Sequence, residues 1–298
     1  GYSSRYVNAG DIRNQGIELS LAVTPLRLSN SLTWQSRFNF SRNVGKVEKI
    51  AKGYDQYVYS WCAIYSDQDA RVYAIAKEGE RMGNLYGTGF KHTPDGSILV
   101  DESGLPVADP TLVKLGNYNP DFILGWSNSL RYKGFTLDFL LDWHQGGVFV
   151  SRTFGMGMES GVLKQTEDRT PEHMVVKGEC YDAATDQYVT NTKQVSPRDY
   201  YRNLYRRYHE TQSTFSATFL KLREVSIGYD LPKRWLSHTP IKALNFSIVG
   251  RNLWMWTKGQ DMVDPEAVTY EGNSVTPGVE EMSYPTMRSL GFSVHATF

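Results

Sequence analysis

The chain has 298 residues, and its 32 basic and 32 acidic side chains give a formal net charge of zero. This length is ample for a hydrophobic core, while the balanced charge argues against a nucleic-acid-binding protein, which usually shows a basic excess or a basic face. The longest stretch without Asp, Glu, Lys or Arg is the 11 residues 56–66. A membrane-spanning helix needs about 20 apolar residues, so a helical membrane protein is excluded.

The first predicted elements are two strands, residues 17–24 and 31–41, joined by a short connection. Strict alternation of apolar and polar residues is typical of a strand whose two faces meet different surroundings. In these two segments the apolar positions are Ile17, Leu19, Leu21, Val23, Leu32, Trp34, Phe38 and Phe40. A connection of 80 residues, 42–121, follows them.

The middle of the chain predicts three more strands. Residues 122–132 and 135–143 alternate on either side of Lys133-Gly134, which has the length of a tight hairpin turn. A connection of 75 residues, 144–218, follows, and its segment 201–208 has the clearest helical spacing in the chain. In residues 219–229 the apolar phase switches between Leu222 and Val225, which predicts a β-bulge.

The last predicted strands are residues 243–252 and 287–298, so the chain has about seven long strands. Their connections alternate between short and long, which places every long loop at one end of the sheet. This rhythm, with aromatic residues near both strand ends, is the plan of an antiparallel transmembrane β-barrel of the outer-membrane type with long extracellular loops. A soluble β-sandwich shares the alternation and stays open as an alternative.

Six segments, in order along the chain, resemble the SusC/RagA-type TonB-dependent outer-membrane transporters. They are 8–19 (NAGDIRNQGIEL), 78–87 (EGERMGNLYG), 116–120 with 132–135 (GNYNP and YKGF), 219–232 (FLKLREVSIGYDLP), 251–266 (RNLWMWTKGQDMVDPE) and 284–298. Arg81 and Gly259 depart from the family pattern, where a proline and an aromatic residue are expected.

This resemblance implies a barrel of about 22 strands, an N-terminal plug and a segment that contacts TonB. Since the chain begins at Gly1 and ends on a strongly patterned strand, we expect residues 1–298 to be the C-terminal portion of a single barrel domain, without the plug and the N-terminal strands. The resemblance also implies import of a nutrient, most simply an oligosaccharide or glycan fragment, with a SusD-like surface lipoprotein as partner. A peptide importer of the same family and a soluble glycan-binding β-sandwich protein are the alternatives.

Aromatic residues in the loops and carboxylates in the lumen are the candidates for contact with a solute. Aromatic faces stack on sugar C–H faces, and their polar tips form hydrogen bonds. Packing of the loops against one another is the competing explanation, since loops this long need cores of their own. The candidate ligand-binding residues are Tyr54, Tyr57, Trp61, Asp138, Asp142, Tyr201 and Tyr205.

No catalytic, metal or cofactor motif stands beside these candidates. Asp138 and Asp142 share one strand face about 13 Å apart, too far for a glycosidase pair, and pairing with a neighbour such as Arg131 explains them better. We therefore predict a protein that is not an enzyme and needs no cofactor or metal. Cys62 and Cys180 both fall in predicted extracellular loops, and whether they are bridged stays open. The terminal Phe298 resembles the signal read by the barrel-assembly machinery.

Overall fold

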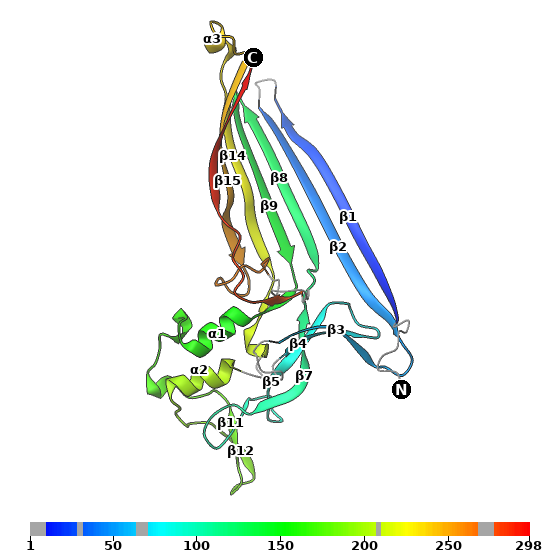
Figure 1. The fold of residues 1–298 in the computed structure, drawn as a ribbon, viewed down its shortest axis with the longest axis vertical. Coiled ribbons are helices and arrows are strands. Elements are labelled where there is room, and N and C mark those ends of the chain that lie inside the picture. The colour runs from blue at the N-terminus through cyan, green and yellow to red at the C-terminus, as the bar shows by residue number, and fades with distance from the viewer. Residues whose placement is uncertain (1–9, 29–31, 64–70, 207–209, 268–276) are drawn as a thin grey trace, which may run out of the picture.

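A computed structural model describes residues 10–28, 32–63, 71–206, 210–267 and 277–298. Its main feature is one antiparallel sheet of seven strands, tall and curved, with smaller elements gathered at one end (Figure 1). In sheet order the strands are β1 (Gly10–Arg27), β2 (Thr33–Ile50), β8 (Phe122–Tyr132), β9 (Phe135–Gln145), β14 (Phe219–Asp230), β15 (Ala243–Thr257) and β17 (Ser289–Thr297).

The two faces of this sheet differ as the alternation predicts. One face presents apolar side chains, such as Ile17, Ile227 and Phe292, which are 64%, 58% and 84% exposed. Paired positions on neighbouring strands share that face, as Leu137 and Ile227 do. Exposed apolar side chains in one continuous band are what a lipid-facing barrel wall requires. The seven strands lie in a single sheet, so the two packed layers of a β-sandwich are not formed.

Two polar residues interrupt the apolar face where β2 and β8 pair. Ser36 and Asn128 are directly opposite each other, and both are buried. The indole Nε1 of Trp34 donates to Asn128 Oδ1 at 3.0 Å, and the Nε1 of Trp126 donates to Ser36 Oγ at 2.8 Å. The oxygen atoms of Ser36 and Asn128 thus each accept from an indole N–H, which lowers the cost of placing them on an apolar face.

The turns at one end of the sheet are short, as predicted. Lys133 and Gly134 form the two-residue turn between β8 and β9, and both have positive φ, 46° and 88°. This backbone twist matches the twist of the flanking strands. The longer turn between β14 and β15 contains the helix α3 (Lys233–Leu236). The predicted β-bulge in β14 is confirmed by a register shift between Leu222 and Glu224 against both neighbouring strands.

Several strands are longer than the sequence predicted: β15 continues to Thr257 and β9 to Gln145, and the largest differences are in β1 and β2. β1 and β2 each have 18 residues and pair from Gly10 with Ile50 to Arg27 with Thr33. The predicted strands, 17–24 and 31–41, were therefore too short. The part of β1 that the prediction missed contains Asp11, Arg13 and Asn14 and shows no alternation of apolar and polar residues. Strand pairing continues there beyond the apolar band of the sheet.

The three long connections contain structure of their own, and we call residues 51–121, 146–218 and 258–288 the first, second and third loops. The first holds β3 (Gln56–Ala63), β4 (Arg71–Lys77), β5 (Asn84–Phe90), β6 (Leu99–Val100) and β7 (Ala108–Asn117). The second holds β10 (Val148–Ser151), α1 (Arg152–Ser160), β11 (Glu179–Asp182), β12 (Gln187–Thr190), α2 (Pro197–Tyr205) and β13 (Thr214–Ser216), and the third holds β16 (Val279–Glu280). Short 3₁₀ helices lie at Lys164–Thr166, Pro171–His173 and Glu210–Ser213. None of the helices in the described ranges is long and apolar enough to cross a membrane.

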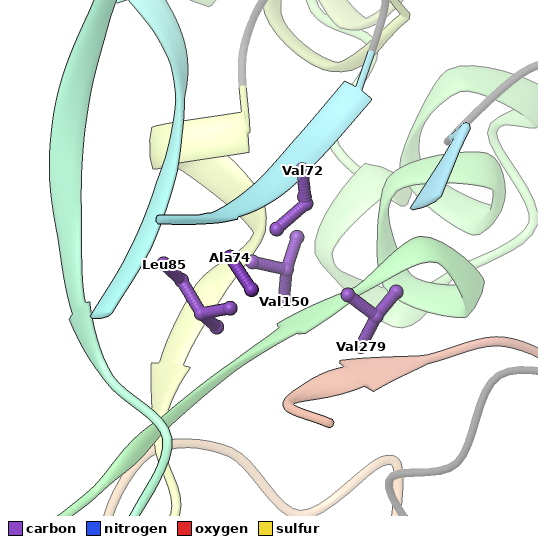
Figure 2. Close-up of a cluster of buried hydrophobic side chains, with 5 residues drawn as sticks. All are labelled: Val72, Ala74, Leu85, Val150 and Val279. Carbon is purple, nitrogen blue, oxygen red and sulfur yellow. The ribbon is translucent and has the colours of Figure 1, made fainter. Parts of the chain in front are cut away.

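The three loops share one hydrophobic core. Figure 2 shows side chains from β4, β5, β10 and β16 meeting in one cluster. Its members, Val72, Ala74, Leu85, Val150 and Val279, are completely buried. β10 of the second loop also pairs in parallel with β16 of the third, and β11 of the second pairs with β6 of the first. The three loops therefore form one joined unit, the loop cap, at one end of the sheet.

Candidate functional site: a charged cluster at the loop end of the sheet

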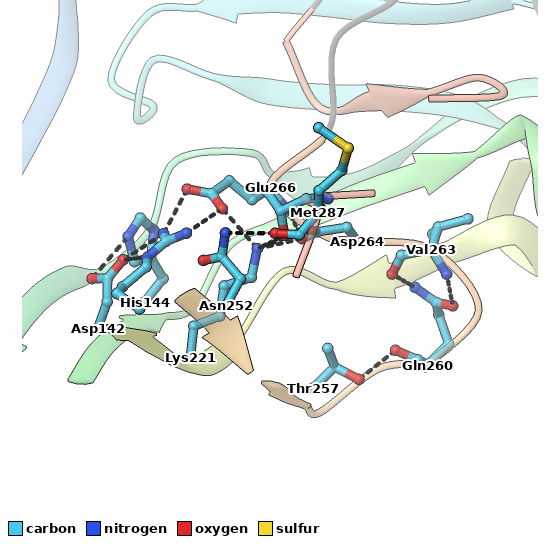
Figure 3. Close-up of polar contacts among 12 residues, drawn as sticks. Asp142, His144, Lys221, Asn252, Thr257, Gln260, Val263, Asp264, Glu266 and Met287 are labelled. Atoms are coloured by element: carbon cyan, nitrogen blue, oxygen red, sulfur yellow. Dashed lines mark hydrogen bonds and ion pairs between the residues drawn. The ribbon is translucent and has the colours of Figure 1, made fainter. Parts of the chain in front are cut away.

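Lys221 of β14 is the centre of a charged cluster where the sheet meets the third loop (Figure 3). Its side chain is only 1% exposed, and its Nζ donates to Asp264 Oδ1 and Oδ2, both at 2.8 Å, and to Glu266 Oε2 at 2.7 Å. A buried ammonium group is tolerated only with such charged partners. Thr286 completes the arrangement, because its Oγ1 donates to Asp264 Oδ2 at 2.6 Å.

Arg223 extends the cluster to the neighbouring strand. Its guanidinium group donates to Asp142 Oδ2 of β9 and to both carboxylate oxygens of Glu266, at 2.5 to 2.8 Å. His144 lies 3.4 Å from the other oxygen of Asp142 and stacks on the ring of Phe219. The partner of Asp142 is thus Arg223, and the pairing with Arg131 that we considered from the sequence is not what the structure shows.

One strand supplies both cations because Lys221 and Arg223 stand two positions apart and so share the inner face of β14. The bulge leaves Arg223 without a register partner on either neighbouring strand and puts Val225 and Ile227 on the apolar face together with Leu222. The resulting cluster holds two cations and three carboxylates, so most of its charge is internally balanced. Its chemistry is that of a clamp that fastens a loop to the sheet.

The third loop is shaped by further side-chain contacts with its own backbone. Gln260 Oε1 accepts from the backbone N–H groups of Met262 and Val263, at 2.6 and 2.9 Å. Asn252, with a positive φ of 50°, donates from Nδ2 to the carbonyl oxygen of Met287 at 3.1 Å. Figure 3 shows the contact between Asn252 and Met287 beside the charged cluster, with the contacts of Gln260 farther from it.

Other residues of the family-like segments attach two parts of the first loop to each other, next to the start of β8. Asn117 donates from Nδ2 to the carbonyl oxygen of Met82 and to Asn84 Oδ1, at 3.0 and 2.9 Å. Arg81, which stands where the family pattern has proline, bonds to Asp121 at 2.9 Å and to the carbonyl oxygen of Pro120 at 2.7 Å. The departure from the pattern thus adds an ion pair to the same attachment.

The two lumen carboxylates that the sequence singled out lie on the inner face of β9 but line different hollows. Asp138 lines a hollow of about 570 Å³ between β2, β8, β9 and β14, together with Gln35 and Arg37. Asp142 lines another of about 510 Å³, next to Glu18 and Asn39. A solute passing along this wall would meet polar side chains at both places.

The aromatic candidates of the first loop are accessible. Tyr54, Tyr57 and Trp61 are 66%, 54% and 48% exposed. Tyr59 differs from these three residues, because it packs against the shared loop core. It lies at a register shift in β3, between Val58 and Ser60. The open rings of this loop are therefore available to a solute or to a partner protein.

The aromatic candidates of the second loop lie inside it. Tyr201 and Tyr205 belong to α2 and pack in a second buried cluster with Phe154, Met158 and Met174. The Tyr201 hydroxyl donates to the carbonyl oxygen of Asp168 at 2.9 Å. Both tyrosines serve the packing of the loop in this structure. The helical spacing predicted for 201–208 is confirmed as far as Tyr205, where α2 ends. The helix begins earlier than predicted, with a Ser196 cap on the Asp199 N–H and Pro197 in its first turn.

The remaining candidates are at the strand ends and in the hairpins. Phe298 is 70% exposed and continues the apolar row of β17. Cys180, in β11, is a free thiol whose Sγ lies 3.7 Å from the carbonyl oxygen of Val189. The side chain of Cys62 lies outside the described part of the chain, as does Tyr208.

Sequence reasoning missed the four residues that form the centre of the cluster: Lys221, Arg223, Asp264 and Glu266. A signal was present, since two cations and two carboxylates each stand two positions apart within the family-like segments 219–232 and 251–266. Their spacing puts like charges on one side of an extended chain. Only the fold brings the two pairs together.

The cluster predicts a response to acid. Burial by itself would raise the pKa of Asp264, but the hydrogen bonds from Lys221 and Thr286 outweigh it, so its pKa lies below the ordinary 3.8. Burial would also raise the pKa of Glu266, but the hydrogen bonds from Arg223 and Lys221 lower it by more. The pKa of Glu266 therefore lies below the ordinary 4.5. A carboxyl group with a lowered folded-state pKa stabilises the fold above its unfolded-state pKa, and that contribution is lost as the pH falls through the folded-state pKa.

We therefore expect the melting-temperature advantage of the wild type over Asp264→Asn to be constant above about pH 4.5 and to shrink as the pH falls below about 3.8. Tryptophan fluorescence of the complete protein in detergent measures both melting temperatures. An advantage that stays the same down to pH 2 would contradict a charged clamp.

Comparison with known proteins agrees with this architecture. No protein-family model matches the chain. It is 26% identical to the TonB-dependent receptor P3 of Formosa agariphila and 24% identical to receptor P26 of the same organism, each match covering 100% of the chain and 30% of the receptor. Among solved structures, the RagAB peptide transporter has a TM-score of 0.64 at 19% identity, again over 100% of the chain and 30% of the transporter chain. The chain thus spans about three tenths of these relatives, it is similar to TonB-dependent receptors over all of its residues, and its fold is that of the corresponding part of the RagAB transporter.

Proposed function

We propose that these residues form the C-terminal part of a barrel that imports a nutrient across the outer membrane under the control of TonB. The observation that carries the proposal is the seven-stranded sheet, with a lipid-type apolar face, a polar inner face and all long loops at one end. Similarity of all 298 residues to about three tenths of each of two TonB-dependent receptors supports it. The plug, the TonB-contacting segment and the other strands then belong to parts of the receptor outside these residues.

The free edges of the sheet support closure with further strands. β1 and β17 each have one neighbour among the described strands, on opposite sides of the sheet. Unpaired strand edges are not tolerated in a lipid environment, because their backbone groups find no hydrogen-bond partner there. Both edges therefore pair with upstream strands in the proposed barrel, and Phe298 at the end of the last strand serves as its assembly signal.

The proposed substrate class is an oligosaccharide or glycan fragment, and a SusD-like lipoprotein covers the loop cap. The exposed rings of Tyr54, Tyr57 and Trp61 support sugar binding, because such rings stack on sugar faces. Peptide import is the second candidate, favoured by the similarity of the fold to the RagAB peptide transporter. The lipoprotein partner is supported by the family resemblance and by the shared core and strand pairing of the three loops, which join them into one cap.

Deletion of the gene separates these candidates. We expect the deletion strain to lose growth on one class of oligosaccharide as sole carbon source and to keep growth on the monosaccharide, with uptake abolished when TonB is inactivated. Loss of growth on peptides instead would select the second candidate. Unchanged growth and uptake on every oligosaccharide and peptide would refute import.

A single residue tests the role of the exposed rings. For an oligosaccharide that the receptor imports, Tyr57→Ala is expected to weaken binding about two- to tenfold, the effect of one aromatic contact. Tyr57→Phe keeps the ring and serves as the matched control, with near wild-type affinity. Isothermal titration calorimetry on the purified complete receptor measures both, and equal affinities for Tyr57→Ala and wild type would remove this residue from the binding surface.

A further inference from the structure

The side-chain charge at the short-turn end of the sheet is predominantly positive. Its turns and adjoining strand ends contain one acidic residue, Asp230, although the whole chain is neutral. The basic residues there are Arg27, Arg131, Lys133, Lys233, Arg234 and Lys242. Such a separation of charge within a neutral chain indicates a surface for an anionic partner.

Two neighbouring turns bring the exposed cations together. The backbone N–H of Asp230, at the end of β14, donates to the carbonyl oxygen of Gly134 at 2.8 Å, so the 133–134 turn lies against the turn that contains α3. Lys133, Lys233 and Arg234 are exposed, and within the described ranges none of them forms an ion pair with a carboxylate. The carboxylate of Asp230 instead accepts from Asn245 Nδ2 at 2.7 Å.

The exposure of these turns does not depend on strands beyond this chain. β8, β9, β14 and β15 are inner strands of the sheet, each with a neighbour on both sides. Figure 1 shows α3 extending past the strand ends on the side away from the loop cap. Further strands would join the sheet at its two edges, β1 and β17, and would leave these turns uncovered.

Aromatic rings accompany the cations. Tyr132 and Phe135 are 45% and 57% exposed on the apolar face at this end, and Lys133 Nζ lies 5.1 Å from the centre of the Tyr132 ring. Trp235 follows Lys233 and Arg234 in α3, and its side chain is 61% exposed. The next residue, Leu236, is buried. Tryptophan and tyrosine beside long basic side chains are typical of the headgroup level of a membrane.

We propose that Lys133, Lys233, Arg234 and Trp235, the short-turn rim, bind the headgroups of anionic glycerophospholipids. The charge complementarity selects these lipids, because three exposed cations with aromatic neighbours attract a headgroup with net negative charge and gain little from one whose charges cancel. The leaflet is the one at the short-turn end of the sheet, opposite the loop cap. This binding goes beyond nutrient import and requires only that the sheet crosses the membrane.

Native mass spectrometry of the complete receptor tests the proposal, with mixed micelles that contain phosphatidylethanolamine and phosphatidylglycerol at a ratio of three to one. We expect wild type to retain phosphatidylglycerol in excess of that ratio. In Lys133→Gln/Lys233→Gln/Arg234→Gln the retained phosphatidylglycerol is expected to fall on the order of tenfold relative to phosphatidylethanolamine. Raised salt should reduce the wild-type preference in the same direction.

A triple variant in the loops provides the matched control. Lys52→Gln, Lys91→Gln and Lys164→Gln remove the same charge from exposed positions of the cap and should leave the lipid ratio unchanged. An unchanged ratio in the rim variant would overturn the proposal, as would an equal fall in the loop variant. A parallel loss of both lipids in the rim variant would also overturn it, because apolar contact alone would then explain retention. Resistance of the folded barrel to unfolding in cold SDS confirms that each variant is assembled.

Discussion

Replacing Lys221 by methionine is expected to release the third loop from the sheet. The substitution keeps the length of the side chain but leaves Asp264, which is 1% exposed, without its cation. Removing one partner of a buried ion pair costs about 3–5 kcal/mol, because the remaining charge stays buried and unpaired. Hydrogen–deuterium exchange of the complete receptor should therefore show a loss of protection across residues 258–267 and 277–288 that is far larger than in the strands of the sheet.

Two further variants make the result specific to the charge. Lys258→Met changes an exposed lysine at the start of the same loop and is expected to leave exchange unchanged. Lys221→Met combined with Asp264→Asn removes the orphaned charge and should recover part of the protection. If Lys221→Met exchanges like the wild type, the cluster does not hold the loop.

A charged residue on the apolar face is expected to have a comparably large effect on the sheet itself. Leu141 lies in the middle of β9, opposite Trp126 and Leu222 on the apolar face. An arginine near the midplane of a lipid-facing barrel wall costs about 2–4 kcal/mol. Leu141→Arg should therefore lower the unfolding free energy of the complete receptor by that amount, measured by urea titration in lipid vesicles.

The neighbouring position supplies the control at the same depth. Leu140 pairs with Ser127 and Glu224 on the inner face, so Leu140→Arg places the same charge in the lumen and is expected to cost much less. Leu141→Ala measures the packing that is lost without the charge. Equal costs for arginine at positions 140 and 141 would show that the apolar face does not meet lipid.

The main sheet could be predicted from the sequence because its two faces meet different surroundings. A period of two is visible wherever one face is apolar and the other polar, as in β9 and β17. The period of two is lost in β1 and β2 beyond the apolar band. In β1, for example, the strand continues through Asp11 and Arg13, where neither face is consistently apolar. Hydropathy patterns report the surroundings of a strand, and a paired strand with the same surroundings on both faces gives no such pattern.

The charged cluster could not be predicted, although its residues stand in segments that drew attention. Lys221 and Asp264 are 43 positions apart, and their contact depends on how the third loop folds back over the sheet. The aromatic candidates show the same limit. Composition alone does not separate Tyr57, which is exposed on β3, from Tyr201, which is buried in α2, because that difference is decided by the packing of each loop.

The core shared by the three loops has a consequence for biogenesis. Val72 and Leu85 come from the first loop, Val150 from the second and Val279 from the third, so the last contact partner is far along the chain from the first. Until the final hairpin is in place, apolar side chains of the first two loops stay partly exposed to solvent. In that state the loops are susceptible to proteolysis and aggregation. Closure of this core thus distinguishes a finished receptor from one that has stalled before its last strand.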